Sequence, residues 1–207
     1  MTATLNDTIP FPSLFVTNAR ILRGEQDRAV GGFYAFLLRP SAPLEDPRGI
    51  DDAAPGGAAL FPLWAAALGV ITLRNMIIRE EDETLHLFSA VPPAWLEPGK
   101  AVVFENAPTR FGKISVSVEA GQDSVFVRFT RPERSDPARV LVHLPPDLEI
   151  TGIGRCGREI RVSGVREVLI PGNELTDEND LELAVRRTPG GPHRDSASRA
   201  ARPDAVY

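Results

Sequence analysis

The sequence predicts a mainly β protein with an N-terminal helical segment, an antiparallel β-sandwich preceded by about three helices. Apolar residues recur at helical spacing up to residue 75, and beyond it they alternate with polar residues at a period of two. The strand candidates in the second part follow one another at intervals of about ten residues, as in antiparallel sandwiches. We therefore expect a helical segment over residues 1–75, a β-sandwich over 76–187 and a disordered tail over 188–207.

The helical part contains three segments with apolar residues at helical spacing, Ser13–Leu22, Glu25–Leu38 and Pro62–Met76. The second opens with acidic residues, which favours a helix N-terminus, but Gly31 and Gly32 weaken it. The third is apolar nearly all round, so it needs neighbours on every side. At about 18 Å it is shorter than the roughly 30 Å of bilayer hydrocarbon, which favours a buried helix over a membrane span.

The β part begins near Met76 and contains a clear hairpin. Lys113–Ala120 and Val125–Phe129 alternate in polarity on either side of a Gly-Gln-Asp turn. The other strand candidates are Met76–Arg79, Thr84–Ala90, Ala101–Glu105, Arg139–Leu144, Glu149–Ile153, Glu159–Ser163, Arg166–Ile170 and Leu181–Arg186. Between two of them, Pro92–Gly99 is typical of a single helical turn closed by Pro-Gly.

Composition excludes more functions than it suggests. The formal charge is −5, so no basic field indicates nucleic acid or an anionic membrane as a partner. Cys156 is the only cysteine, which excludes an intramolecular disulfide and a cysteine-based zinc site. The three histidines are far apart in the chain, and we expect no metal and no cofactor. No basic residue precedes Arg20, so we expect no signal peptide, and a cytoplasmic protein if Met1 is the true start.

Three motifs with catalytic associations have simpler structural interpretations. The acidic runs Glu80–Glu83 and Asp177–Asp180 fit solvated turns between strands better than a calcium site. Gly152–Gly157 resembles a dinucleotide-binding loop, but the residues after it alternate like a strand where that motif needs a helix. Cys156 lies between two arginines that would lower the pKa of its thiol, yet no partner base is identifiable.

Aromatic residues and a long acidic loop provide the candidate carbohydrate contacts. The apolar faces of sugar rings stack on Trp and Tyr, so Trp64 and Tyr34 are candidates, with core packing as the alternative for both. The loop Pro40–Gly57 is longer than compact domains usually carry, and loops of this length are often functional or mobile. It contains Asp51 and Asp52, which complete the candidate sugar-binding set.

One stretch resembles a known architecture. The helix end Leu73–Glu80 leads into a hairpin, a Pro-Pro-Ala-Trp-Leu turn at 92–96 and the segment Asn106–Ser115. This is similar to the join between the last barrel helix and the C-terminal β-sandwich of large glycoside hydrolases with an (α/α)6 toroid, the α-L-rhamnosidase-like six-hairpin glycosidases. The resemblance covers residues 57–186, and no catalytic carboxylate of that family can be matched to a position in this sequence.

The resemblance implies a C-terminal, non-catalytic part of a glycoside hydrolase-like protein, whose sandwich buttresses a sugar-cleaving toroid. Three helices cannot close such a ring, so the expected partner is the remainder of the toroid, from the same gene or another chain. Carbohydrate is a further expected partner, and activity of this chain alone is not expected. The alternatives are a stand-alone carbohydrate-binding module and an interaction or assembly subunit unrelated to sugars.

Overall fold

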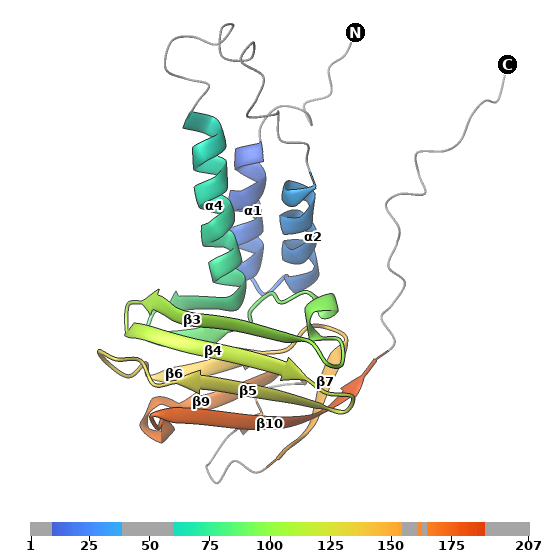
Figure 1. Ribbon diagram of the computed structural model, residues 1–207, viewed down its shortest axis with the longest axis vertical. Helices are drawn as coiled ribbons and strands as arrows, with labels where there is room; N and C mark the ends of the chain where they lie inside the picture. The colour runs from blue at the N-terminus through green and yellow to red at the C-terminus, as the bar shows by residue number, and fades with distance from the viewer. Residues whose placement is uncertain (1–9, 39–59, 155–160, 163–164, 189–207) are drawn as a thin grey trace, which may run out of the picture.

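The computed structural model describes residues 10–38, 60–154, 161–162 and 165–188. Three helices, α1 (Pro10–Leu22), α2 (Gln26–Leu37) and α4 (Leu60–Ile77), stand side by side on a two-layered β-sandwich (Figure 1). The predicted helices are thus confirmed, each within a few residues of its predicted bounds. The predicted loop at 40–57 and nearly all of the predicted tail lie outside the described residues.

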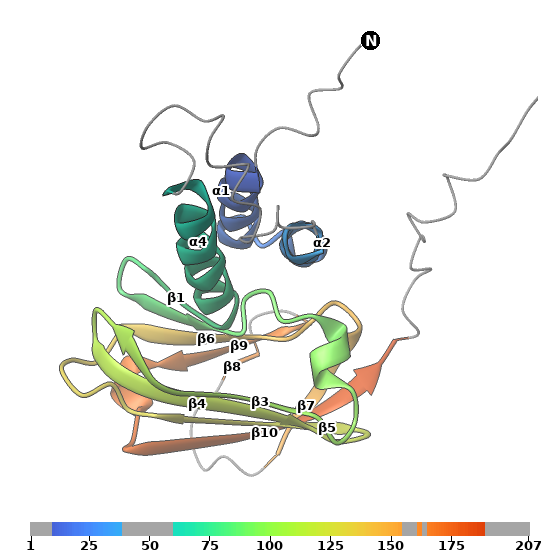
Figure 2. The ribbon, with the colours of Figure 1, turned by 45° about the horizontal axis from the view of Figure 1, so that its top comes forward.

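The strands form two five-stranded sheets that lie face to face (Figure 2). The first has the order β1-β2-β6-β9-β8, and the second has the order β3-β4-β5-β10-β7. In the first sheet the strands are β1 (Ile78–Glu81), β2 (Thr84–Leu87), β6 (Arg139–His143), β8 (Arg161–Val162) and β9 (Glu167–Pro171). In the second they are β3 (Ala101–Thr109), β4 (Gly112–Ala120), β5 (Ser124–Thr130), β7 (Leu148–Ile153) and β10 (Glu178–Arg187).

The predicted mainly β fold with an N-terminal helical segment is confirmed, and the expected antiparallel pairing has one exception. Strands β2 and β6 are parallel, with Leu85 opposite Val140 and Leu87 opposite Val142. The chain passes through β3, β4 and β5 of the other sheet between these two strands, so no hairpin fixes their relative direction. All other pairings in the described sheets are antiparallel.

One hydrophobic core fills the space between the sheets. Alternate residues of β4 and β5 point inward and pair across the strands, with Val116 opposite Phe129 and Val118 opposite Val127. Leu181 of β10 continues the same row on the next strand. Burying each of these side chains contributes about 1.5–3 kcal/mol, and a shift of one residue in register would turn the whole set to solvent.

The helices have a smaller core of their own, which meets the sandwich at its edge. Leu14, Ile21 and Phe33 pack with Met76 at the end of α4, and Leu73 contacts both this cluster and the sandwich core. Gly32 explains the glycine pair that weakened the α2 prediction. A Cβ at Gly32 would collide with the Thr17 hydroxyl, so this glycine permits close packing of α1 and α2, whereas Gly31 faces open space.

A half-buried ion pair fixes α4 to the sandwich. The Arg74 guanidinium donates two hydrogen bonds of 2.8 Å to the Glu80 carboxylate and a third, also 2.8 Å, to the carbonyl of Pro108. Burial alone would raise the pKa of Glu80, but the Arg74 hydrogen bonds and the backbone N–H of Arg110 lower it below its ordinary value. The predicted solvated turn at Glu80–Glu83 is therefore wrong for Glu80, which joins the helix to two strands.

In the part of the chain that the structure covers, no helix is both long and apolar enough to cross a membrane.

The predicted helical turn is present as a short 3-10 helix, η1 (Pro93–Leu96). This short helix contacts α2, because the Trp95 indole Nε1 donates a 3.0 Å hydrogen bond to the hydroxyl of Tyr34.

Candidate functional site

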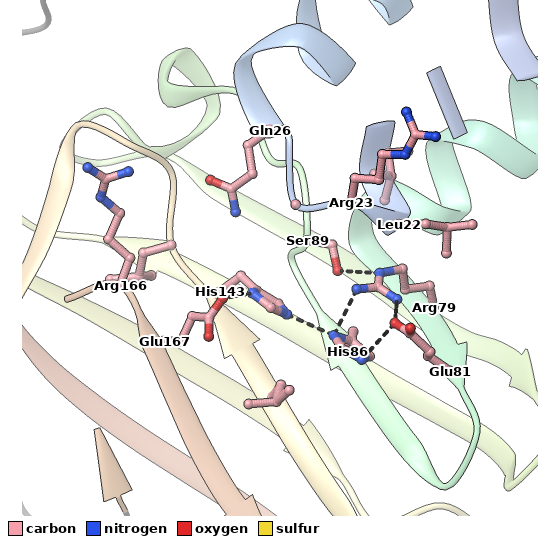
Figure 3. A pocket seen from close by; sticks show the side chains of 14 residues that line it. Leu22, Arg23, Gln26, Arg79, Glu81, His86, Ser89, His143, Arg166 and Glu167 are labelled. Carbon is pink, nitrogen blue, oxygen red and sulfur yellow. Dashed lines mark hydrogen bonds and ion pairs between the residues drawn. The ribbon is translucent and has the colours of Figure 1, made fainter. Parts of the chain in front are cut away.

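A cavity of about 440 Å³ lies between the turn that joins α1 to α2 and the first sheet (Figure 3). Its floor is the sheet face opposite to the sandwich core, and its polar lining includes Arg79 and Glu81 of β1, His86 of β2, His143 of β6 and Glu167 next to it on β9. From the helical side the cavity is covered by Ile21, Leu22, Arg23, Gly24 and Gln26. The strands thus bring together polar and titratable residues from distant parts of the chain.

The floor residues form one continuous chain of polar contacts across four strands, which we call the histidine ladder and define as Arg79, Glu81, His86, His143 and Glu167. Arg79 donates to the Glu81 carboxylate at 2.6 Å, and its Nη2 lies 3.0 Å from His86 Nδ1. His86 Nδ1 also lies 3.0 Å from His143 Nε2, and His143 Nδ1 lies 3.1 Å from Glu167 Oε1. The planes of the two imidazole rings are nearly parallel, with an angle of 6° between them, and the ring centroids are 5.2 Å apart.

Burial makes both histidines weak bases. It lowers the pKa of His143 to about 4, with the Arg79 charge as a second cause. Burial also lowers the pKa of His86 to about 4, and the charges of Arg79 and His143 add to the effect. At neutral pH both rings are therefore neutral. The pKa of Glu81 is lowered too, chiefly by its hydrogen bond from Arg79.

Among the described residues that line the cavity, no nucleophile is paired with a histidine of the ladder. The Ser89 hydroxyl accepts a hydrogen bond from Arg79 Nε at 3.1 Å and has no histidine beside it as a base. Among the residues that the structure describes, no group of three or more His, Cys, Asp or Glu side chains is arranged to hold a metal ion. Arg79 makes one contact each to Glu81, His86 and Ser89. Its main effect is therefore to orient His86 and Glu81.

The sequence did not point to this ladder, and Tyr34, the one predicted sugar contact whose side chain the structure describes, is not part of it. Tyr34 is half-buried and accepts the hydrogen bond from Trp95. Trp64 belongs to α4, but its side chain is outside the described part of the structure, as are Asp51 and Asp52. His86 and His143 are 57 residues apart, and only the parallel pairing of β2 with β6 makes them neighbours. The one signal in the sequence is that each is a polar residue among the apolar positions of a short strand.

A second feature is the set of large apolar side chains that the helices leave exposed, which we call the exposed helical face. It consists of the exposed large apolar residues of the three helices and the residue after α2: Phe15, Val16, Leu22, Leu37, Leu38, Val70 and Ile71. On α4, Val70 is 67% exposed, and the other exposed positions of the same helix side, at 66 and 67, are alanines. Only Val103, Phe126 and Val165 are comparably exposed in the described sandwich.

These features define the class of protein, a β-sandwich that carries a three-helix layer with an uncovered apolar surface. Compared with protein-family models, with curated proteins and with solved structures, the chain matches none.

Proposed function

We propose that this chain is a non-catalytic part of a glycoside hydrolase-like protein, in which its sandwich and helices buttress further helices of an (α/α) toroid. The observation that carries the proposal is the exposed helical face. A helix with apolar residues on every side is stable in water only when neighbours cover it, and α4 leaves Val70 and Ile71 uncovered. Further helices of a toroid are partners with matching apolar faces.

The joint between α4 and the sandwich supports a buttressing role. Helix α4 continues into β1 without a loop, and Arg74 ties its last turn to Glu80 and to the backbone of β3. Leu73 contacts both hydrophobic cores. The helices are thus held at a fixed angle to the sandwich, as a support for other helices requires.

The structure gives less support to a stand-alone carbohydrate-binding module. Such a module would present a row of exposed aromatic rings on one sandwich face. In the described sandwich Phe126 is the one aromatic residue in the exposed class, and Trp95 is half-buried against Tyr34. An assembly subunit unrelated to sugars would use the same exposed helical face. The identity of the partner therefore decides between such a subunit and a part of a glycoside hydrolase-like protein.

The test is to identify and add the missing helices. We expect the DNA directly upstream of the Met1 codon to encode helical hairpins in frame or in an adjacent gene. The polypeptide from that DNA should bind this chain and hydrolyse aryl glycosides, while the chain alone should give no turnover above background. Replacing both Val70 and Ile71 by Glu should abolish binding, and Val103→Glu on the sandwich is the matched control.

Two results would overturn the proposal. One is an upstream region with a promoter and ribosome-binding site and no helical hairpins. The other is glycoside hydrolysis by the chain alone that is lost when Asp51 or Asp52 is changed to Asn, because that would make the chain an enzyme in its own right.

A further inference from the structure

The floor of the cavity holds buried hydrogen-bond donors from which no described residue accepts. The three contacts of the Arg79 guanidinium use one N–H each of Nε, Nη1 and Nη2. Since a guanidinium has five N–H groups, one on Nη1 and one on Nη2 have no acceptor among the described residues. The Ser89 hydroxyl accepts from Nε, and its own proton likewise has no acceptor in that part of the chain. Both residues are buried, at 6% and 3% exposure, so a group inside the cavity has to accept from them.

The same floor also offers acceptors. Glu81 contacts Arg79 and His86 through Oε2. Glu167 contacts His143 through Oε1. The other oxygen of each carboxylate, Oε1 of Glu81 and Oε2 of Glu167, accepts from no described residue. A hydroxyl group both donates and accepts, so hydroxyl groups match a floor of this mixed character.

Donors and positive charge line the exposed side of the cavity. Gln26, the first residue of α2, extends toward the ladder, and the exposed Arg23 and Arg166 stand on either side of it (Figure 3). No described residue pairs with the side chains of these three residues. Arg79 is neutralised by Glu81, and both histidines are neutral at neutral pH. The two exposed arginines therefore outweigh the remaining carboxylate, Glu167, and the lining is net positive.

The size and the apolar part of the cavity indicate more than an inorganic ion. Its volume of about 440 Å³ corresponds to about fifteen water molecules at roughly 30 Å³ each, and sites for small molecules measure about 300–1,000 Å³. Ile21, Leu141 and Leu144 form an apolar part of the lining. An inorganic anion would leave this part and most of the volume unused, whereas the carbon skeleton of a molecule of monosaccharide size contacts it.

We propose that the cavity binds a small hydroxylated organic anion, a molecule of monosaccharide size that carries one carboxylate or phosphate. Its hydroxyl groups bond the floor, where they accept from Arg79 and Ser89 and donate to the free carboxylate oxygens. Its anionic group lies on the exposed side, between Arg23 and Arg166, where the lining has uncompensated positive charge. The site lies within this chain, so binding does not require further helices on the exposed helical face.

The test is calorimetric titration of the full chain with three sugars that differ only at carbon 6: glucose, glucuronate and glucose 6-phosphate. We expect one or both anionic sugars to bind with a dissociation constant below about 1 mM, and glucose at least tenfold more weakly. The tighter of the two anions distinguishes a carboxylate ligand from a phosphate ligand. Absence of binding by both anions, or equal affinity for glucose, would overturn the proposal. Equal affinity for acetate or inorganic phosphate would also overturn it, because the hydroxylated body would then contribute nothing.

Paired variants separate the cavity from the net charge of the chain. The Arg23→Gln, Arg166→Gln double variant should bind the anionic sugar at least tenfold more weakly. The Arg128→Gln, Arg186→Gln double variant changes the net charge equally on the second sheet, and its affinity should stay unchanged. Ser89→Ala removes a floor donor and should also weaken binding. An equal loss in both double variants, or no loss in the Arg23, Arg166 variant, would contradict the proposed site. The assay contains no second polypeptide, so its outcome is independent of the proposed toroid.

Discussion

The two buried histidines predict that the protein loses stability in mild acid. The ordinary pKa of a histidine is 6.5, and that of His86 and His143 in the folded chain is about 4. Because the folded value is lower, the unfolded chain binds protons first as the pH falls. The stabilisation is complete above the unfolded pKa and is lost as the pH decreases towards the folded one.

The size of the effect follows from the shift. At pH 5 an unfolded histidine is almost fully protonated and a folded one with a pKa of about 4 is not, which costs about 2 kcal/mol for each ring relative to pH 7. Because the two rings are in contact, their protonations influence each other, and the free energy of unfolding falls by about 2–4 kcal/mol in total. The range from pH 7 to pH 5 lies above the lowered pKa values of Glu80 and Glu81. Protonation of these two carboxylates lowers the free energy of unfolding further in stronger acid.

Urea unfolding at fixed ionic strength between pH 7 and pH 5 measures this change. The variant with Gln at both positions 86 and 143 keeps an acceptor for Arg79 but has no titrating side chain at either of these two positions. Its free energy of unfolding should be nearly flat over the window. An equally flat curve for the unmodified chain, or the same slope in the variant, would refute the burial argument.

Four substitutions test the packing. Gly172→Ala should destabilise the fold by about 3 kcal/mol, because the new Cβ would collide with the carbonyl of Pro137. Gly31→Ala meets open space on α2 and should stabilise the fold by about 0.5–1 kcal/mol. Equal effects of the two substitutions in chemical unfolding would contradict this packing. Phe129→Ala should cost about 3–5 kcal/mol in the same assay, and less than about 1 kcal/mol would place it outside the core. Tyr34→Phe should cost about 1 kcal/mol through the lost Trp95 hydrogen bond, and a double-mutant cycle with Trp95→Phe should show the coupling.

The elements could be predicted from the sequence because each has a clear local pattern. Helix α4 is a run of apolar residues with Pro62 in its first turn, where a missing N–H costs little. The β4–β5 hairpin follows from strict alternation around a short turn. These signals depend only on residues close together in the chain.

The strand order and the candidate site could not be predicted, because both depend on distant contacts. Nothing near β2 or β6 specifies that they pair in parallel, and this pairing is what brings His86 next to His143. For the same reason Glu80 was interpreted as part of a solvated turn, although it is the partner of Arg74 at the joint of helix and sandwich. Tyr34 was selected as an aromatic residue, but its polar partner Trp95 is far along the chain.

Calorimetric titration of the chain with the polypeptide encoded directly upstream tests the central claim most directly. The account predicts tight binding with a negative heat-capacity change, as expected for apolar surfaces that become buried. It also predicts at least a hundredfold weaker binding for the chain with Glu at both positions 70 and 71, and unchanged binding for Val103→Glu. No binding by the unmodified chain, or equal affinity for all three forms, would contradict the claim that the exposed helical face is the docking surface for further helices.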